Sequence, residues 1–448
     1  MVTSKPARQS LVREMLAEQI VPLQQAEAER AKKVDTLVLG GPDPVRRTQS
    51  RDVEKATLLE LSHTSLLSLI IQYSAQQIVA EGFAAGTEDM SRMWEPFDRN
   101  GVPSQQGALW RAMLTYGVAY GLALPGDNGA YLRGFSPKRF GALYGDPVDD
   151  EFPMWAWRMI PQAGGKQHWR VYDDNHVYLL SYENGAYNFI EARKHGMGVV
   201  PVVKFTNDAD LEGNAKGEPD KYRLDAARHD KTVNDRLLIQ HYNSWRVKYA
   251  IKMSQTWSEQ DREEFRLKLA HDDILIGDGD TEFGTLDQTD LGPMKAAQEA
   301  DRDLLAAVSQ TPVWAFNGGS MVNLSADALV EAKSGNRQKV WEIQRGIGRS
   351  MCKWARLAAQ AEGRVEDAQR FDLSTQWADI GSQSLSAAAD ALGKLASGLN
   401  VPDEMLWEMI PGVTATQVAN WREWARTHPE GDDLIASVLS RQISPTYG

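Results

Sequence analysis

The segment from Ser325 to Gly363 contains no proline and keeps apolar side chains three or four positions apart. This period is typical of one buried face of an α-helix. Ser325 is placed to cap the helix, and Asp327 suits the positive end of its dipole. A helix of roughly 35 residues extends about 50 Å, which indicates an element that crosses a large assembly. The apolar stripe consists of Leu329, Val340, Ile343, Ile347, Met351, Trp354, Leu357 and Ala361.

Two helices with an insert between them precede this long helix. The pattern predicts one helix over Tyr222–Lys248 and a second from Pro293 to Gln310, with proline in its favoured first turn. The insert is expected to hold a helix over Ser258–Ala270 and two strands around a glycine-rich turn within Asp273–Asp287. Gly318-Gly319 then supplies a hinge before the long helix.

The N-terminal half mixes helices with a β region. Helices are expected over Leu11–Lys33, over Val53–Glu81 and on both sides of the Asn100-Gly101 turn. Short β-rich runs begin at Trp155, and Asn184-Gly185 predicts a hairpin among them. Further extended segments are predicted at Tyr120–Leu124 and Val199–Phe205.

The remainder of the chain is helical, with predicted helices at Leu385–Leu399, Pro402–Ile410, Thr414–Thr427 and Asp432–Arg441. From residue 366 onward it carries 12 acidic residues against 5 Lys and Arg. The fold class that follows is α+β and mainly helical.

Composition narrows the class of protein. Hydrophobic content of 42% and charged content of 25% are ordinary for a globular chain, and the 14 tryptophans suit cores and interfaces. The single cysteine, Cys352, lies in the long helix and is expected to be a buried apolar side chain in a reducing compartment. No signal peptide or membrane span is evident, so we expect a protein made in a cytoplasm. A net charge of −12 argues against tight binding to nucleic acid, because phosphate neutralisation normally supplies that affinity.

Catalytic and metal motifs are missing. The sequence has no P-loop, no dinucleotide fingerprint, no His-Glu-x-x-His and no Gly-x-Ser-x-Gly. Asp278–Glu282 is interpreted as an acidic turn rather than a calcium loop, and Asp149, Asp150 and Glu151 as a solvated loop rather than a catalytic pair. We therefore expect no enzyme, no cofactor and no metal.

Four blocks of residues, in this order, resemble the portal proteins of tailed bacteriophages, specifically the SPP1-type portal family. They are Trp94 and Asn100 with Ala108–Leu124; Gly198, Pro201, Phe205 and Asn207 with Gly217–Asp220, Val233–Asp235 and Asn243; Thr311-Pro312 with Asn323–Leu329; and Gln376–Ile380 with Ala389-Asp390, Val401–Glu404 and Pro411–Thr414.

The resemblance implies an elongated subunit of a ring, usually of twelve copies, around a channel for double-stranded DNA. It implies binding to terminase, a head–tail adaptor, and major capsid and scaffolding proteins, in the virion after assembly in the host cytoplasm. The implied regions are the wing (1–221), stem helices (222–248 and 293–310), clip (249–292), tunnel loop (311–324), long helix with a strand at Trp377–Ile380 (325–380), and crown with C-terminal tail (381–448).

Site residues follow from that mapping. Asn317, Gly318, Gly319, Ser320 and Met321 are predicted to line the channel, and Trp314 and Phe316 to anchor the loop. Lys295 and Arg302 lie seven residues apart on the second stem helix and are candidate channel cations; the alternative is pairing with Glu299, Asp301 or Asp303 on the helix surface.

Two other functions remain open on the sequence. One is a Trp- and acid-rich polysaccharide hydrolase, which needs two converging carboxylates. The other is a helical adaptor that binds only proteins.

Overall fold

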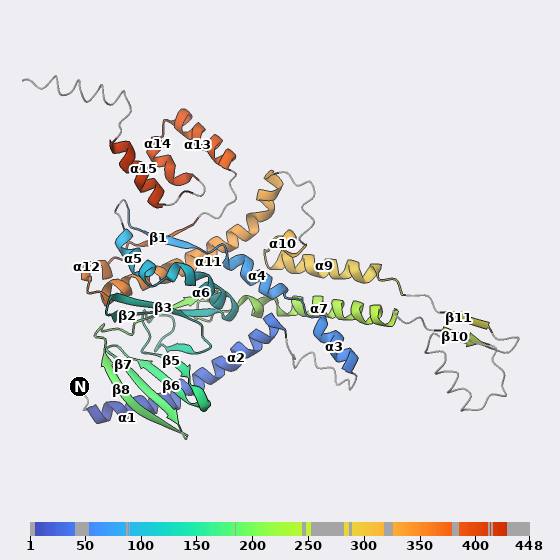
Figure 1. Cartoon of the computed structure of the whole chain (residues 1–448), viewed down its shortest axis with the longest axis horizontal. Coiled ribbons are helices and arrows are strands. Elements are labelled where there is room, and N and C mark those ends of the chain that lie inside the picture. The colour runs from blue at the N-terminus through green and yellow to red at the C-terminus, as the bar shows by residue number, and fades with distance from the viewer. Residues whose placement is uncertain are drawn as a thin grey trace, which may run out of the picture. The chain divides into compact units, whose positions relative to one another are not determined.

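The computed structural model describes residues 5–40, 53–86, 88, 90–183, 185–243, 248–251, 282–285, 289–317, 326–378, 385–410, 413 and 415–427. The chain divides into two compact units, Met1–Trp377 and Ala378–Gly448. Within the described residues it is a mixed α+β protein, mainly helical (Figure 1).

The N-terminal helical run is longer than expected. It consists of α1 (Lys5–Met15), a π-helical turn η1 (Leu16–Ile20) and α2 (Val21–Leu39). Its first part lies across a five-stranded sheet, burying Val12, Leu16 and Ile20 against Trp157 and its neighbours. Gln24 fixes the register, since its amide donates to the Lys138 carbonyl at 2.9 Å and its oxygen accepts from the Trp157 indole at 2.9 Å.

The prediction of one helix over Val53–Glu81 is wrong. The structure has α3 (Val53–Leu61), α4 (Leu66–Ala75) and a strand β1 (Ala80–Ala84). The helix breaks where Thr64 donates from its backbone and hydroxyl to the buried Asp230 carboxylate, at 3.1 and 2.7 Å. A long-range hydrogen bond thus overrides the local helical period.

Helices α5 (Ser91–Arg99) and α6 (Val102–Tyr116) confirm the predicted pair, and Gly101 adopts φ +64 between them. Three strands follow in the order β3-β2-β9: β2 (Val118–Gly126), β3 (Gly129–Phe135) and β9 (Val202–Thr206). The sequence had indicated β2 and β9 but not β3.

The predicted β region forms an antiparallel sheet of five strands in chain order. They are β4 (Phe140–Leu143), β5 (Trp155–Pro161), β6 (Gln167–Tyr172), β7 (His176–Glu183) and β8 (Ala186–Lys194), with a 3-10 turn η2 (Ala163–Gly165) between β5 and β6. A shared apolar cluster that includes Leu122, Phe140 and Tyr172 joins this sheet to the three-stranded one. Strand β4 was not predicted.

The long helix α11 (Ala326–Ala361) has 36 residues and confirms the prediction; Ser325, its expected cap, lies outside the described residues. Its buried Trp354 donates to the Leu122 carbonyl at 3.1 Å and lies over Gly121, where a Cβ would be only 2.9 Å from the indole. Glycine at 121 is therefore what lets α11 approach β2.

A short helix α12 (Val365–Ala368) and strand β12 (Ser374–Trp377) follow α11. β12 pairs antiparallel with β1, from Ala80–Trp377 to Ala84–Ser374. β12 ends at Trp377, the first residue of the predicted strand Trp377–Ile380. Asp379 and Ile380 lie outside the described residues.

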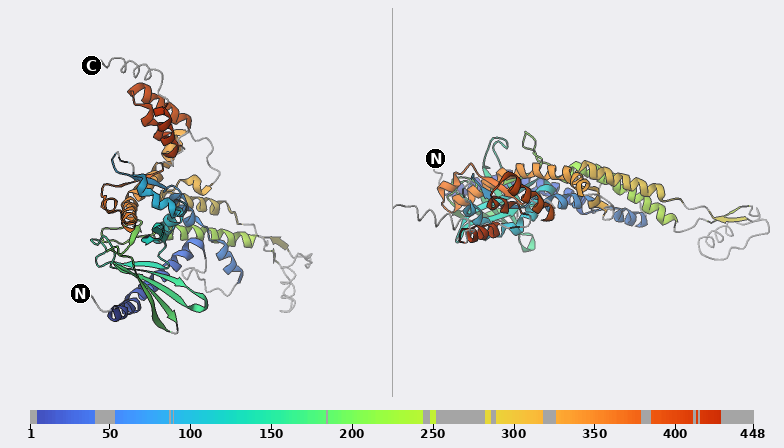
Figure 2. Two further views of the ribbon diagram at one scale, coloured as in Figure 1. Left: turned by 60° about the vertical axis from the view of Figure 1, so that its left-hand side comes forward. Right: turned by 90° about the horizontal axis from the view of Figure 1, so that it is seen from above.

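Helices α7 (Glu218–Asn243) and α9 (Gly292–Val308) lie side by side and antiparallel (Figures 1 and 2). Asp301 of α9 accepts hydrogen bonds from Arg228 at 2.9 Å and Thr232 at 2.6 Å on α7. At the far end, the Asn243 amide donates to the Thr289 carbonyl at 2.8 Å and accepts from its N–H at 3.3 Å.

Beyond these helices, β10 (Lys248–Ile251) pairs antiparallel with β11 (Glu282–Thr285). The sequence had placed Lys248 at the end of a helix, which is wrong because Lys248 begins β10. It had paired 282–285 with the strand before the glycine-rich turn, and that strand lies outside the described residues. The long-range pairing with β10 was not predicted. The predicted helix Ser258–Ala270 and the first predicted strand lie outside the described residues.

The second unit is helical: α13 (Leu385–Leu399), α14 (Asp403–Leu406), a 3-10 turn η3 (Trp407–Met409) and α15 (Ala415–Thr427). Its centre holds Leu406 and Val418, with the Trp407 and Trp421 rings edge to face at 6.1 Å. The predicted helix Asp432–Arg441 lies outside the described residues.

One buried ion pair joins the helices of the first unit. Glu218, the first residue of α7, accepts from the Lys339 ammonium of α11 at 2.5 Å, and both side chains are less than one-tenth exposed. Lys339 also donates to the carbonyl of Ser309, the residue that follows α9, at 3.1 Å. An anion at the start of α7 and a cation at the end of α9 both suit the helix dipoles.

Neighbouring groups complete the cluster. Lys221 lies 3.1 Å from Glu218, and the Asn207 amide donates to the same carboxylate at 3.2 Å. Burial opposes ionisation of Glu218, but the ammonium groups of Lys339 and Lys221 hold its pKa below the ordinary value.

Replacing Lys339 with Met should destabilise the chain strongly, since it leaves the Glu218 carboxylate buried without its closest cation. We expect the free energy of unfolding to fall by about 3–5 kcal/mol, measured by urea unfolding followed by tryptophan fluorescence at fixed protein concentration. The control Lys231→Met removes an exposed i,i+4 pair with Asp235 on α7 and should cost less than about 1 kcal/mol. Equal losses in the two variants would contradict a special role for Lys339.

The same pair predicts an acid-dependent loss of stability. Because the folded-state pKa of Glu218 is lowered, its contribution is present at higher pH and disappears as the pH falls below about 4.5. The Glu218→Gln/Lys339→Met double variant lacks this contribution, so its stability should decline less steeply there than that of the wild type. Parallel pH profiles of unfolding would show that Glu218 titrates normally.

Candidate channel and assembly surfaces

The connection between α9 and α11 begins with ordered structure rather than with the loop expected over 311–324. After α9, Gln310 adopts φ +53, and the Gln310 and Thr311 N–H groups bond back to Ala307 and Ala306. This is the geometry of a Schellman cap. Thr311 and Pro312 are buried, and α10 (Val313–Asn317) then forms one short helix. The loop prediction is therefore wrong for 313–317. After the Schellman cap ends α9, the chain turns and forms the short helix α10.

The predicted anchors lie on α10. Trp314 and Phe316 are half-buried, and Phe316 packs against the main apolar core. Their role as anchors stays a prediction. Asn317 ends the helix, and the other predicted channel residues, Gly318, Gly319, Ser320 and Met321, lie outside the described residues.

The two candidate channel cations lie on α9 in different surroundings. Lys295 is exposed, and no ion pair to it is found among the described side chains. Arg302 is one-fifth exposed, with its Nε 3.8 Å from Asp303. Asp301, one of the alternative partners, is already bonded to Arg228 and Thr232. Whether Lys295 and Arg302 face a channel stays a prediction.

The end of α9 also exposes apolar side chains. Leu304 and Val308 are 45% and 44% exposed, and Val313 of α10 is 38% exposed. Leu304 and Val308, four residues apart, share one face of α9, and Val313 lies within the predicted tunnel loop.

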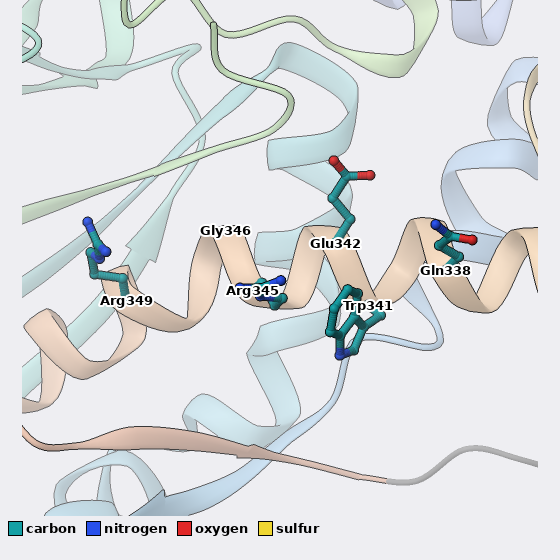
Figure 3. A pocket seen from close by; sticks show the side chains of 6 residues that line it. All are labelled: Gln338, Trp341, Glu342, Arg345, Gly346 and Arg349. Atoms are coloured by element: carbon teal, nitrogen blue, oxygen red, sulfur yellow. The ribbon is translucent and has the colours of Figure 1, made fainter. Parts of the chain in front are cut away.

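The solvent face of α11 carries a second surface. Gln338, Trp341, Glu342, Arg345, Gly346 and Arg349 line an open groove along successive turns of this one helix (Figure 3). Trp341 is 56% exposed, and the Arg345 guanidinium lies 4.8 Å from the centre of its ring. We call Arg337, Trp341, Arg345 and Arg349 the basic ridge, because they follow one another at four-residue spacing on exposed positions.

Sequence reasoning missed this ridge because it considered only the apolar stripe of the same helix. The signal was present, since three arginines and a tryptophan recur every fourth residue. It also missed the Glu218–Lys339 pair, which no local pattern could indicate.

The thiol and the carboxylates that the sequence offered as possible catalytic groups make structural contacts. Cys352 is buried, its thiol donates to the Leu373 carbonyl at 3.3 Å, and burial raises its pKa, which makes it unreactive. Asp150 accepts from the Asp146 N–H at 2.8 Å, and Glu151 pairs with Arg356 at 2.8 Å. Asp278–Asp280 lies outside the described residues.

Over the described part of the chain, no three His, Cys, Asp or Glu side chains gather as a metal site. In the same residues, no helix is both long and apolar enough to span a bilayer.

Residues 25–429 match the model of a family described as phage portal protein, SPP1 Gp6-like. No curated protein matches the chain. Among solved structures, it is similar to a chain of the neck of a native gene transfer agent particle computed with C12 symmetry, with 10% identity, a TM-score of 0.48, and coverage of 86% of this chain and 94% of that one. It is also similar to a chain of the virion of a native gene transfer agent particle, with 11% identity, a TM-score of 0.44, and coverage of 83% and 95%.

The family match covers most of the sequence, and proteins of this family are structural components of the virion rather than enzymes. The chain belongs to the SPP1 Gp6-like phage portal protein family.

Proposed function

We propose that this chain assembles with further copies of itself into a closed ring, most simply of twelve, at the head-to-tail vertex of a tailed phage. The ring conducts double-stranded DNA inward during packaging and outward during ejection. The observation that carries the proposal is the family match over residues 25–429.

The regional roles extend the proposal along the chain: wing (1–221), stem (222–248 and 293–310), clip (249–292), tunnel loop (311–324), long helix and return strand (325–380) and crown with tail (381–448). The antiparallel pair α7 and α9 supports a stem, because two helices joined side to side make a stiff rod (Figure 2). The β10–β11 pair beyond them supports a small separate tip at the clip.

Charge supports a conduit. A net charge of −12 repels the duplex and limits the number of phosphate contacts, so DNA can slide without being held. A small number of cations, such as Lys295 and Arg302, would reduce this repulsion locally. Terminase, the head–tail adaptor, and major capsid and scaffolding proteins would dock on this ring, with the clip as a projecting docking tip.

Purified full-length protein should form rings with a central hole. Mass photometry should give a species of about twelve times the 49.9 kDa subunit mass, and negative-stain images should show the hole. A stable monomer under all salt conditions and concentrations tested would overturn the proposal. Rings that neither package nor retain DNA would favour a protein-only adaptor.

Deleting Asn317–Met321 should leave rings intact while impairing DNA packaging or retention, because this segment is proposed to contact the passing duplex. Packaging is measured as nuclease-protected DNA and assembly by mass photometry. Phe316→Ala is the matched comparison, since it removes a side chain packed on the core and should lower thermal stability. Loss of rings in the deletion variant would instead make the segment a packing element.

A further inference from the structure

We propose that the basic ridge of α11 is one half of the contact between neighbouring subunits, and that it docks onto an acidic surface of a second copy of this chain. This inference rests on the proposed ring and adds which residues hold adjacent subunits together.

The ridge is held rigidly before any partner arrives. The opposite face of α11 is anchored in the core through Ile347, Met351 and Trp354, each at most 1% exposed. Binding therefore costs little ordering of the backbone, which favours a stable contact.

Its composition is that of a protein interface. Trp341 is 56% exposed to solvent, although burying a tryptophan side chain removes a large apolar area from water and is strongly favourable. Arg345 lies against the Trp341 ring, which restrains its guanidinium while leaving N–H groups free to donate. Tryptophan and arginine are the residues most enriched among those that dominate binding energy.

The three ridge arginines differ from the other cations described on α11. Lys339 pairs with Glu218, and Arg356 pairs with Glu151, while Lys353 donates to the Glu151 carbonyl. Arg337, Arg345 and Arg349 have no ion pair among the described side chains, and Glu342 is the one acid in the groove. The chain carries −12, so removing the +3 of these arginines leaves −15 on the remainder, and a neighbouring copy therefore carries a net charge opposite to that of the ridge.

Charge also decides the symmetry of the contact. Two copies of the ridge would repel each other, so the ridge cannot pair with itself in a two-fold dimer. It must meet a different surface on the next copy, and such head-to-tail contacts generate rings when they close.

Duplex DNA is the competing occupant, since phosphates would also attract arginines. The proposed role as a DNA conduit argues against DNA as the occupant of the ridge. Three clustered arginines on every subunit of a ring would together bind DNA tightly, whereas the DNA has to slide. The tryptophan at the centre of the ridge has no role in contacting phosphates.

The test compares three full-length variants by mass photometry over a dilution series at two salt concentrations. Arg345→Glu/Arg349→Glu and Trp341→Ala should each raise the subunit concentration for half-dissociation by about tenfold or more, equivalent to ~1.4 kcal/mol. The charge-reversal effect should shrink at high salt. Lys194→Glu, which reverses an exposed cation on β8, is the control and should assemble as the wild type does.

Hydroxyl-radical labelling provides an independent readout, because Trp341 should be modified less in rings than in dissociated subunits. If wild-type rings form and the ridge variants match them, with equal labelling of Trp341 in both states, the ridge is not an interface and only this inference fails. If the ridge variants assemble normally but lose DNA retention, the arginines contact DNA and the inference is overturned. If wild-type protein forms no rings at all, the proposed function fails with it.

Discussion

The ion pair between Glu218 and Lys339 is the contact through which the helices of the first unit support one another. Lys339 reaches from α11 to the start of α7 and to the carbonyl that ends α9, so one ammonium group meets two helix termini of opposite polarity. Burying both charges is costly, and it is tolerated because Lys221 and Asn207 donate to the carboxylate oxygen that Lys339 does not contact. Such a pair specifies geometry more than it adds stability. A proposed stem that is rigid relative to its wing depends on this kind of junction.

Helix α11 shows how one element can serve the subunit and the assembly together. One face is fixed to the three-stranded sheet by Trp354 over Gly121, and the other carries the basic ridge. The face that packs inward determines where the outward face points, because a helix cannot rotate one side without the other. A contact between subunits built on such a helix is therefore prepared by the core of each subunit.

Electrostatics separates the proposed roles of the surfaces. An acidic chain suits a channel that must not hold its cargo, whereas a local cationic ridge suits adhesion between acidic copies. The candidate channel cations Lys295 and Arg302 are sparse by comparison, and Arg302 already lies near Asp303. A guanidinium beside a carboxylate can thus stabilise packing within one subunit or docking between two subunits. Which of the two it stabilises depends on whether the carboxylate belongs to the same chain.

The sequence by itself determined the helices α5, α6, α7, α9 and α11, the five-stranded meander except for β4, and the family, because helical and strand periods are local and family motifs keep their order. It also placed Cys352 in the interior, as the structure confirms. Only the tertiary structure decided the break between α3 and α4, the pairing of β1 with β12 and of β10 with β11, and the partner of Lys339. Each of these depends on a residue distant in the sequence, such as Asp230 for Thr64. The basic ridge lies between the two cases: its spacing was present in the sequence, but its exposure followed only once the opposite face of α11 was buried.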